Sequence, residues 1–297
     1  MTNQPTSPHR PVLVTGGTGK TGRRVAARLE ALGVPHRIGS RRGEPPFDWD
    51  DETTWPSALE GMEAAYLAYS PDLAFPGALE IVRRFTEVAI AHGTSRLVLL
   101  SGRGEEAAEA AEAALQRSGA AWTVVRAAWF HQNFSESFLV DPVRSGRIAL
   151  PAGEVAEPFV DADDIADVAV AALTDDRHVG QVYEVTGPRL LTFADVAASI
   201  SRALARRVAY LPVTADEYRA GALAAGVPAE EIEPLVELFT TVLDGRNASL
   251  SDGVQRALGR PPRDFDDYAR EAAAAGIWTS GAREPASHLG STLGAGP

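Results

Sequence analysis

The stretch VLVTGGTGKTGRR, which begins at Val12, constrains the fold of this 297-residue chain more than any other segment. A short apolar run leads into Gly16-x-x-Gly19-x-x-Gly22, and apolar residues at helical spacing follow. In a dinucleotide-binding turn the first glycine allows the tight turn, the second admits a pyrophosphate and the third lets the helix pack closely. The order of strand, glycine turn and helix therefore predicts the first unit of a Rossmann fold.

A P-loop of the nucleoside triphosphatases is the competing interpretation, because Gly19-Lys20-Thr21 resembles the end of one. Such a loop follows the pattern G-x-x-x-x-G-K-[ST] and needs a further glycine at position 14. Val14 occupies that place, inside the expected strand. No neighbouring apolar run ends in the aspartate that would hold magnesium. The segment therefore favours a dinucleotide over a triphosphate.

Strand-like and helical segments alternate through the first half of the chain. SRLVLLSG and AAWTVVRAAWF have the continuous apolar character of buried strands, and EEAAEAAEAALQRSG between them is helical. This alternation predicts an α/β protein with a Rossmann, doubly wound parallel sheet. After Asn133 the alternation loosens, which indicates a smaller, mostly helical C-terminal lobe. The expected division is a disordered N-terminus over 1–10, a Rossmann core over 11–135, remaining Rossmann elements plus a substrate or cap lobe over 136–278, and a disordered tail over 279–297.

The charge balance and composition limit the partners. The net charge of −12 disfavours nucleic acid and anionic membrane surfaces, and the lack of cysteine excludes disulfides and thiolate chemistry. The sequence has no apolar run of transmembrane length and no secretory signal, and its histidines lack metal-ligand spacing. We expect a cytoplasmic protein without a metal that acts on a small-molecule substrate as a monomer or homodimer.

Several charged segments are interpreted as solvated helix faces or helix starts. Because buried glutamate is rare, Glu105, Glu106, Glu109 and Glu112 are expected to share one solvated face. The arginines of RVAARLE and SRALARR are interpreted in the same way. Asp163 and Asp164 are expected to be the N-cap and first-turn acids of the helix that follows them, rather than a catalytic pair.

The end of the second expected strand indicates the type of cofactor. NAD-binding chains carry an acid there that holds the ribose 2′-hydroxyl. This chain reads Ile38-Gly39-Ser40-Arg41-Arg42 instead, and an arginine can pair with a 2′-phosphate in fork geometry. The pattern therefore predicts NADP(H), with NAD(H) less favoured. Ser40 and Arg41 are the expected main contacts and Arg42 a second one.

Four segments together resemble the NmrA-like, atypical short-chain dehydrogenase/reductase proteins of bacteria. They are VTGGTGKTGRRVAARL, SGAAWTVVRAAWFHQNF, VYEVTGPRLLTFADVAASI and LGRPPRDFDDYARE, and the similarity spans about residues 11–275. The resemblance implies a Rossmann domain and a small C-terminal lobe, with substrate bound between them. Members of this family include NAD(P)H-dependent reductases of quinones and dyes, and also nucleotide-sensing regulators without enzyme activity.

The resemblance also implies roles for individual residues. Asp48 and Trp49 match the segment after the third strand, beside adenine; Ala68, Tyr69 and Ser70 end the fourth strand, beside the nicotinamide ribose. Ser101 ends the fifth strand. The pyrophosphate turn matches Gly16, Thr18, Gly19, Lys20, Thr21 and Gly22, the 2′-phosphate contact matches Arg41, and the segment beside nicotinamide and substrate, after the sixth strand, matches Trp129, Phe130, His131 and Asn133.

One departure from the larger superfamily affects the chemistry. Its Tyr-x-x-x-Lys pair, in which lysine lowers the tyrosine pKa, falls near Gly104 and Ala108 here. Lys20 is the sole lysine, and the residue four positions before it is Gly16, so the pair is absent from the whole sequence. Acceptors whose reduced form is a stabilised anion, such as quinones and other conjugated molecules, need the least help from a general acid.

The candidates for catalysis each have a structural alternative. His131 could transfer a proton, although a hydrogen-bonding wall or surface histidine is the favoured interpretation. Tyr69 could donate a proton or pack on the cofactor, and Ser101 could act in catalysis or cap the next helix. Trp129 and Phe130 could stack on a planar substrate or belong to the core. The sequence thus predicts an NADPH-dependent oxidoreductase of conjugated small molecules, with a non-catalytic NADP-binding sensor as the alternative.

Overall fold

A six-stranded parallel sheet lies at the centre of the computed structural model, which describes residues 10–279. The strand order is β2-β1-β3-β4-β5-β8, and every neighbouring pair is parallel. The predicted disordered ends fall outside the described residues, apart from Arg10 and Thr279. The strands are β1 (Val12–Thr15), β2 (His36–Gly39), β3 (Ala64–Leu67), β4 (Arg96–Gly102), β5 (Ala121–Ala127) and β8 (Gln181–Val185).

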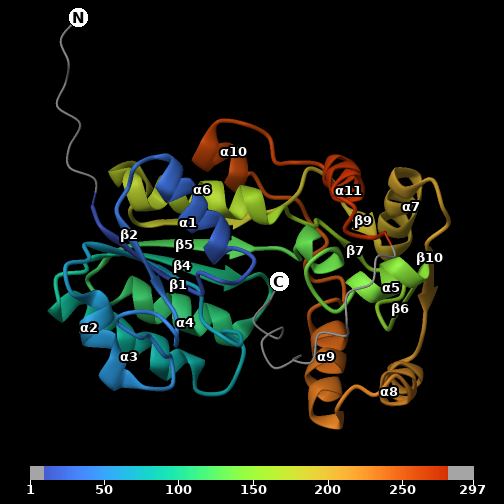
Figure 1. Cartoon of the computed structure of the whole chain (residues 1–297), viewed down its shortest axis with the longest axis horizontal. Helices are drawn as coiled ribbons and strands as arrows, with labels where there is room; N and C mark the ends of the chain where they lie inside the picture. The colour runs from blue at the N-terminus through green and yellow to red at the C-terminus, as the bar shows by residue number, and fades with distance from the viewer. Residues whose placement is uncertain (1–9, 280–297) are drawn as a thin grey trace, which may run out of the picture.

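Helices cover both faces of this sheet, as Figure 1 shows. One face carries α1 (Gly22–Ala31), α6 (Ala162–Thr174) and α10 (Gly253–Leu258). The other face carries α2 (Trp55–Leu59), α3 (Ala78–Ala91) and α4 (Glu106–Gln116). This arrangement confirms the predicted α/β, doubly wound Rossmann architecture.

The apolar strands are explained by burial on both of these faces. Val12 and Val14 pack in the cluster beneath α1 and α6, whereas Leu13 packs with Phe85 in the cluster on the opposite side. All four residues of β1 are buried. A strand between two helical layers has no solvated face, so its sequence is a continuous apolar run rather than an alternating one.

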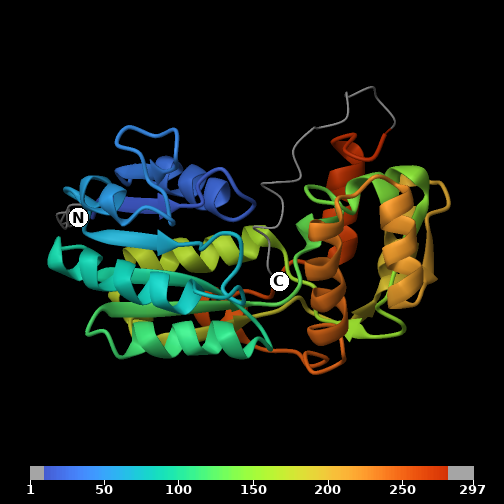
Figure 2. The ribbon, with the colours of Figure 1, turned by 90° about the horizontal axis from the view of Figure 1, so that it is seen from below.

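A second, smaller lobe follows β5 and has its own core. It contains two small sheets, a parallel pair of β6 with β10 and an antiparallel pair of β7 with β9. Its core is rich in aromatic rings, including Phe134, Phe193 and Phe239. Figure 2 shows this lobe beside the sheet. Its elements are α5 (Val140–Ser145), β6 (Arg147–Leu150), β7 (Ala156–Glu157), β9 (Leu191–Thr192), α7 (Phe193–Leu204), β10 (Ala209–Pro212), α8 (Ala215–Ala224), α9 (Ala229–Thr241) and α11 (Phe265–Ala274). Among the described residues, 3-10 turns form at η1 (Glu52–Thr54), η2 (His131–Phe134) and η3 (Asp176–His178).

The strand count expected from the resemblance is one too high. The segment before Asp48 forms only an isolated bridge between Asp48 and Asp51. Pro45 and Pro46 precede it and lack the N–H groups that a strand ladder needs. Ala68 to Ser70 therefore follow the third strand, Ser101 lies in the fourth, and Trp129 follows the fifth.

The predicted solvated face of α4 is also wrong. Glu106 and Glu109 are exposed, but Glu112 is 1% exposed and Glu105 is 7% exposed. Glu112 points to the sheet, where Arg126 forks onto its carboxylate. A buried carboxylate of this kind is stable only with a partner, which the position in a helix could not reveal.

Charged residues of α1 and α6 pair with each other rather than lying free in solvent. Arg24 and Arg28 of the RVAARLE segment both bind Asp163 of α6. The N-cap of α6 is Asp161, whose side chain accepts from the N–H of Asp163 at 2.8 Å. Asp163 and Asp164 are therefore both first-turn acids. The prediction that Asp163 is the N-cap is wrong, because the N-cap lies two residues earlier.

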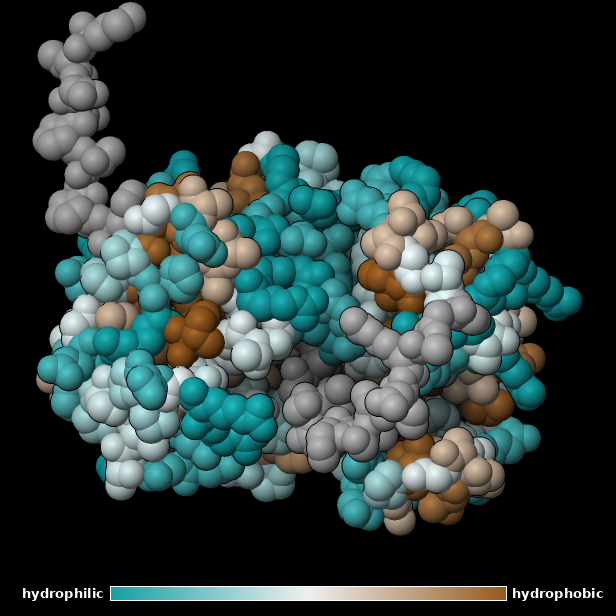
Figure 3. Space-filling view, viewed as in Figure 1, coloured by the Kyte–Doolittle hydropathy of each residue, from teal (hydrophilic) through white to brown (hydrophobic). Residues whose placement is uncertain are grey.

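The visible surface is mostly polar. Figure 3 shows hydrophilic residues over much of one face, with hydrophobic residues in small separate groups. Within residues 10–279, no helix combines the length and the apolar character that crossing a bilayer requires. The same residues contain no group of three or more histidine, aspartate or glutamate side chains positioned for a metal ion.

Candidate functional site

A cleft lies at the carboxyl ends of the strands, where the sheet order changes direction. From β1 the chain passes to β2 on one side and then to β3 on the other. Such a switch point leaves a crevice above the strand ends, where ligands bind in open α/β sheets. The cleft holds about 440 Å³ and is lined mainly by residues that follow β1, β2, β3 and β4.

The glycine turn forms one wall of this cleft and fits the roles predicted for its glycines. Gly16 has a φ of 61°, which favours glycine, and its carbonyl accepts from the N–H of Gly19 at 2.8 Å. A Cβ on Gly22 would lie 2.2 Å from the oxygen of Gly16. The helix α1 can therefore begin directly at the turn only because Gly22 has no side chain. Thr18, Lys20 and Thr21 also line the cleft.

Lys20 is a buried cation without an ion pair. It is 9% exposed, and it forms no ion pair with any residue between 10 and 279. Burial lowers the pKa of its ammonium to about 8, although Glu136 opposes this shift. An unpaired buried charge destabilises a fold unless a ligand compensates it. The ammonium therefore fits an anionic ligand in the cleft, next to the N–H groups that begin α1.

The end of β2 supplies a second cationic wall. Ser40 and Arg41 line the cleft, whereas Arg42 is exposed and outside it. The guanidinium of Arg41 pairs with no carboxylate of the described chain. Of the acids that line the cleft, Asp48 and Asp50 come from the loop after β2 and Asp72 from the segment after β3, so none lies at the end of β2. The end of β2 therefore brings a cation, and no acid, to the cleft.

The loop around Trp49 closes the far end of the cleft. Trp49 is 7% exposed, and its indole N–H donates to the carbonyl of Ala68 at 3.3 Å. Its ring packs edge-on against Phe47 and Tyr69. Asp48 is held by a hydrogen bond from the indole N–H of Trp55 to its carbonyl at 2.7 Å. The loop thus offers a rigid wall for a flat ring.

Tyr69 and Ser101 also line the cleft, together with Ala68, Ser70 and Phe130. Burial, together with the nearby Asp50, raises the pKa of the Tyr69 phenol. Ser101 does not cap α4, because the N-cap is Glu105. Its hydroxyl instead donates to Oε1 of Glu112 at 2.6 Å.

A network of charged side chains holds the partner of Ser101 in place. Arg126 of β5 donates to Glu112 from Nε at 2.9 Å and to Glu184 of β8 from Nη1 at 3.0 Å. The hydrogen bond from Arg126 to Glu112 leads the effects that raise the pKa of this guanidinium. Sequence reasoning missed this network, since its three charged members come from different elements.

Three residues predicted for the substrate site lie outside the cleft. Trp129 is 1% exposed and packs against Phe193 and Phe239 in the core of the second lobe. His131 is fully buried, and its Nε2 lies 2.9 Å from the carbonyl oxygen of Phe159. Asn133 is also buried, at 2% exposed. The favoured interpretation of His131 as a hydrogen-bonding structural residue agrees with this position, while a role in proton transfer does not.

Several cleft residues were not predicted. The available indication was their position, because each lies within a few residues of a predicted site residue, and the strand ends meet at this edge. Asp72 is the one with chemical interest, since it brings a carboxyl group to the cleft beside buried Glu105. The missed residues are Gly39, Phe47, Asp50, Pro71, Asp72, Leu73, Leu100 and Gly102.

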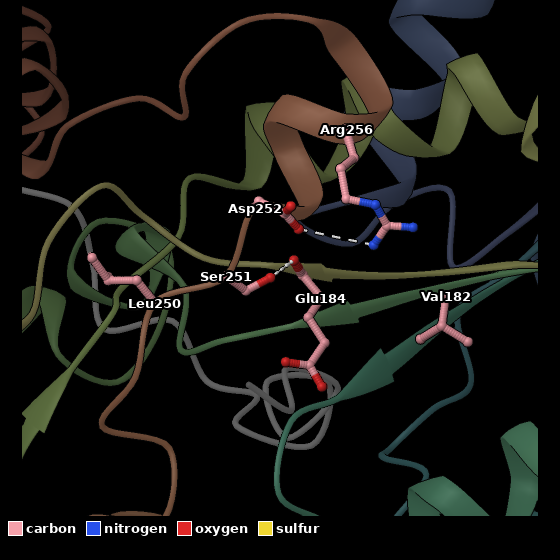
Figure 4. Close-up of a pocket in the computed structure, with 6 residues that line it drawn as sticks. All are labelled: Val182, Glu184, Leu250, Ser251, Asp252 and Arg256. Atoms are coloured by element: carbon pink, nitrogen blue, oxygen red, sulfur yellow. Dashed lines mark hydrogen bonds and ion pairs between the residues drawn. The ribbon is translucent and has the colours of Figure 1, made fainter.

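A second depression of about 720 Å³ lies at the outer edge of the sheet, between β8 and α10. Figure 4 shows that its polar groups bind one another. Ser251 donates to the carbonyl of Glu184 at 2.6 Å, and Arg256 lies 3.9 Å from Asp252. None of the predicted site residues lines it. The cleft above the strand ends is therefore the better candidate site.

The chain is similar in sequence to known oxidoreductases. The chain is 33% identical over 281 residues to an uncharacterized oxidoreductase of Bacillus subtilis, covering 91% of this chain and 97% of that protein. It is 34% identical to the agroclavine dehydrogenase of Claviceps fusiformis, covering 86% and 95%. It is 30% identical to the NAD(P)H azoreductase of Xenophilus azovorans, covering 89% and 98%. These relatives are oxidoreductases. No family model matches the sequence.

Solved structures share the fold. The NADPH complex of an Escherichia coli NADPH-dependent quinone oxidoreductase superposes with a TM-score of 0.75 at 20% identity, over 88% of this chain and 99% of that one. The NADP(H) complex of the Citrobacter triphenylmethane reductase gives 0.71 at 20% identity, over 88% and 99%. Nmra, a negative transcriptional regulator in complex with NAD, gives 0.63 at 18% identity, over 91% and 97%.

Proposed function

The chain belongs to the NmrA-like family of atypical short-chain dehydrogenases/reductases, and we propose that it is an NADPH-dependent reductase of quinone-like, conjugated small molecules. One observation carries the cofactor assignment. The cleft at the switch point brings together a glycine turn, an unpaired buried lysine and an unpaired arginine at the end of β2. These groups suit a ligand with phosphates at two separate places, which NADP has.

Successive parts of the cofactor are assigned to successive residues along the cleft. Gly16, Thr18, Gly19, Lys20, Thr21 and Gly22 would hold the pyrophosphate, and Ser40 and Arg41 the 2′-phosphate, with Arg42 as an outer contact. Asp48 and Trp49 would flank adenine. The nicotinamide would lie by Ala68, Tyr69, Ser70 and Ser101. When bound, it supplies the hydride, while the protein supplies position and electrostatics.

Ser101 is assigned a positioning role in this proposal. Its hydrogen is committed to Glu112, so its free lone pairs can accept from an amide or hydroxyl of the cofactor. Phe130 is the one predicted substrate residue on the cleft wall, and as a core residue that is 2% exposed it adds a small apolar contact there. Trp129, His131 and Asn133 would support the second lobe behind it.

The absence of the Tyr-x-x-x-Lys pair supports conjugated acceptors. Gly104 and Ala108 stand at these two places, and neither has a titratable side chain. A larger residue would not fit at Gly104, which has a φ of 77° and where a Cβ would lie 2.5 Å from Oδ1 of Asn247. A simple ketone develops an alkoxide that needs strong acid assistance. In a reduced quinone the negative charge is delocalised over the ring, so the reaction needs less help from an acid. Positioning of the quinone by the cleft can then account for a larger share of the rate of its reduction.

Turnover of NADPH with a panel of quinones tests this function. The purified protein should consume NADPH only when a quinone is present, and it should use NADH more slowly. A non-catalytic sensor of NADP, the alternative suggested by the regulator of the same fold, would bind NADP tightly and consume none. That outcome with every acceptor would overturn the reductase assignment.

A further inference from the structure

Two carboxyl groups meet at the wall of the cleft without a cation between them. Asp72 follows β3 and lines the cleft, and Glu105 precedes α4. The two carboxyl groups are neighbours at this wall, because Glu105 lies against Gly102, which lines the cleft together with Asp72, and each carboxyl group affects the pKa of the other. Two ionised carboxylates repel when they are neighbours, so the contact is stable only when the pair holds a proton.

The carboxyl group of Glu105 is only partly satisfied by hydrogen bonds within the described chain. It is 7% exposed, and its Oε2 has no hydrogen-bond donor among residues 10–279. Its carboxyl group lies against Gly102 of the cleft wall, where a Cβ on Gly102 would lie 2.7 Å from the carboxyl carbon. The lack of a side chain at Gly102 thus leaves room for the carboxyl group directly behind the wall.

The charged groups around Glu105 do not neutralise it. Arg103 turns away and donates to the carbonyls of Asn247 and Ser249 at 2.9 and 2.7 Å. Arg246 donates to the carbonyl of Gly104 at 3.2 Å and pairs with Asp244. Glu106 is exposed. Burial, followed by the charge of Asp72, raises the pKa of Glu105 to about 8, and burial raises that of Asp72.

We propose that the Asp72–Glu105 pair is the proton donor of this reductase, in place of the missing tyrosine. This inference rests on the proposed function. Hydride addition to a quinone delivers two electrons and one hydrogen, and it leaves a hydroquinone monoanion. An O–H bond of the product then forms as the O–H bond of the pair breaks. The ionised pair regains its proton from water through Asp72, its more exposed member.

A comparison of two acceptors separates proton donation from hydride transfer. A quinone needs a proton as well as a hydride, whereas a cationic triarylmethane dye becomes neutral on taking hydride alone. Glu105→Gln keeps the size of the side chain but removes its acidic proton. It should reduce kcat for the quinone about tenfold or more, and change kcat for the dye less than about twofold. Glu106→Gln, on the exposed neighbour, should change neither.

A titration without cofactor tests the pair directly. In protein labelled with 13C at the glutamate carboxyl carbons, one signal of the wild type should titrate above pH 7. Glu105→Gln should remove that signal, and Asp72→Asn should move its midpoint to lower pH, because the neighbouring negative charge is lost. Equal thermal unfolding temperatures would show that both variants fold.

The outcomes divide clearly. Three results would each overturn the role of the pair while leaving the reductase assignment intact. They are an equal loss of kcat with both acceptors, an unchanged kcat for the quinone, and the absence of a glutamate that titrates above pH 7. A wild-type protein that reduces neither acceptor would overturn the proposed function, and the role of the pair with it.

Discussion

The hydroxyl of Ser101 donates a 2.6 Å hydrogen bond to Glu112, a carboxylate buried under the floor of the cleft. Arg126 also forks onto this carboxylate, so Glu112 is held in place from two sides. The hydroxyl therefore has one orientation, with its hydrogen directed away from the cleft. Ser101 can accept a hydrogen bond from a ligand, but it has no free hydrogen to give.

Ser101→Ala should therefore weaken binding of NADP without abolishing turnover. The loss of one uncharged hydrogen bond corresponds to about 0.5–1.5 kcal/mol, or roughly twofold to tenfold in affinity. The pH dependence of kcat should not change, because the proton donor is elsewhere. Binding titrations and a pH–rate profile measure both quantities. A fall in kcat of about a hundredfold or more with normal NADP affinity would instead make Ser101 catalytic.

Arg41→Ala should weaken NADP and leave NAD nearly unaffected. The guanidinium lines the cleft and has no carboxylate partner in the described chain, so its contact with a 2′-phosphate is available in full. A charge-assisted contact of this kind is worth about 1.5–3 kcal/mol. Arg42→Ala is the matched control, since Arg42 is exposed and outside the cleft, and its effect should be several times smaller. Equal losses for NADP and NAD would contradict the assignment.

The fold and the cofactor side of the cleft could be predicted from sequence, because both depend on local patterns. The glycine spacing specifies the turn between β1 and α1, and the residues after each strand end meet at one edge of the sheet. Ser40 and Arg41 were found in this way, whereas Tyr69 was implied by the family resemblance, and all three line the cleft.

The other side of the cleft depends on contacts between distant elements, and here sequence reasoning failed. Helical spacing places Glu105 and Glu112 near solvated neighbours, and only the packing of α4 on the sheet shows that both are buried. The bend of the chain after β5 similarly sends His131 between Phe265 and Tyr268 instead of into the cleft. No local sequence pattern indicates either the burial of these glutamates or the position of His131.

Gly22→Ala should abolish cofactor binding and destabilise the fold. A Cβ there would lie 2.2 Å from the carbonyl oxygen of Gly16, so the turn or α1 must shift. Forcing an additional methyl group into a packed site costs about 1–3 kcal/mol. Gly221→Ala in α8 is the control, because its Cβ would meet nothing within 4 Å; this change should stabilise slightly. Denaturant unfolding and NADP titration of both variants measure these effects.

The affinity for NADP should fall as the pH rises above about 8. Burial lowers the pKa of Lys20 to about 8, and a bound phosphate favours its protonated form. The free protein thus loses the ammonium at a pH where the complex still keeps it, and binding must take up a proton. Calorimetry near pH 8 in buffers of different ionisation enthalpy should detect this uptake. Lys20→Gln should bind more weakly at pH 7 and show a smaller decline than the wild type between about pH 7.5 and 9.

Glu157→Gln should stabilise the protein at neutral pH but not in acid. Glu157 lies in β7 and is 1% exposed, and burial raises its pKa to about 7 from the usual 4.5. Between these two values the folded chain keeps a proton that the unfolded chain has released. The free energy of unfolding of the wild type therefore falls as the pH rises through this window, by up to about 3 kcal/mol.

The glutamine variant has no such titration, so its advantage over the wild type should grow from about pH 4.5 to 7 and then stay constant. Urea unfolding at pH 5, 6, 7 and 8 measures the difference. Glu154→Gln is the control, because Glu154 is exposed in the loop that precedes β7, and its difference from the wild type should stay small at every pH. A gap between Glu157→Gln and the wild type that does not vary with pH would mean that Glu157 is ionised in the folded protein throughout this range, with Arg103 as the cation that compensates its burial.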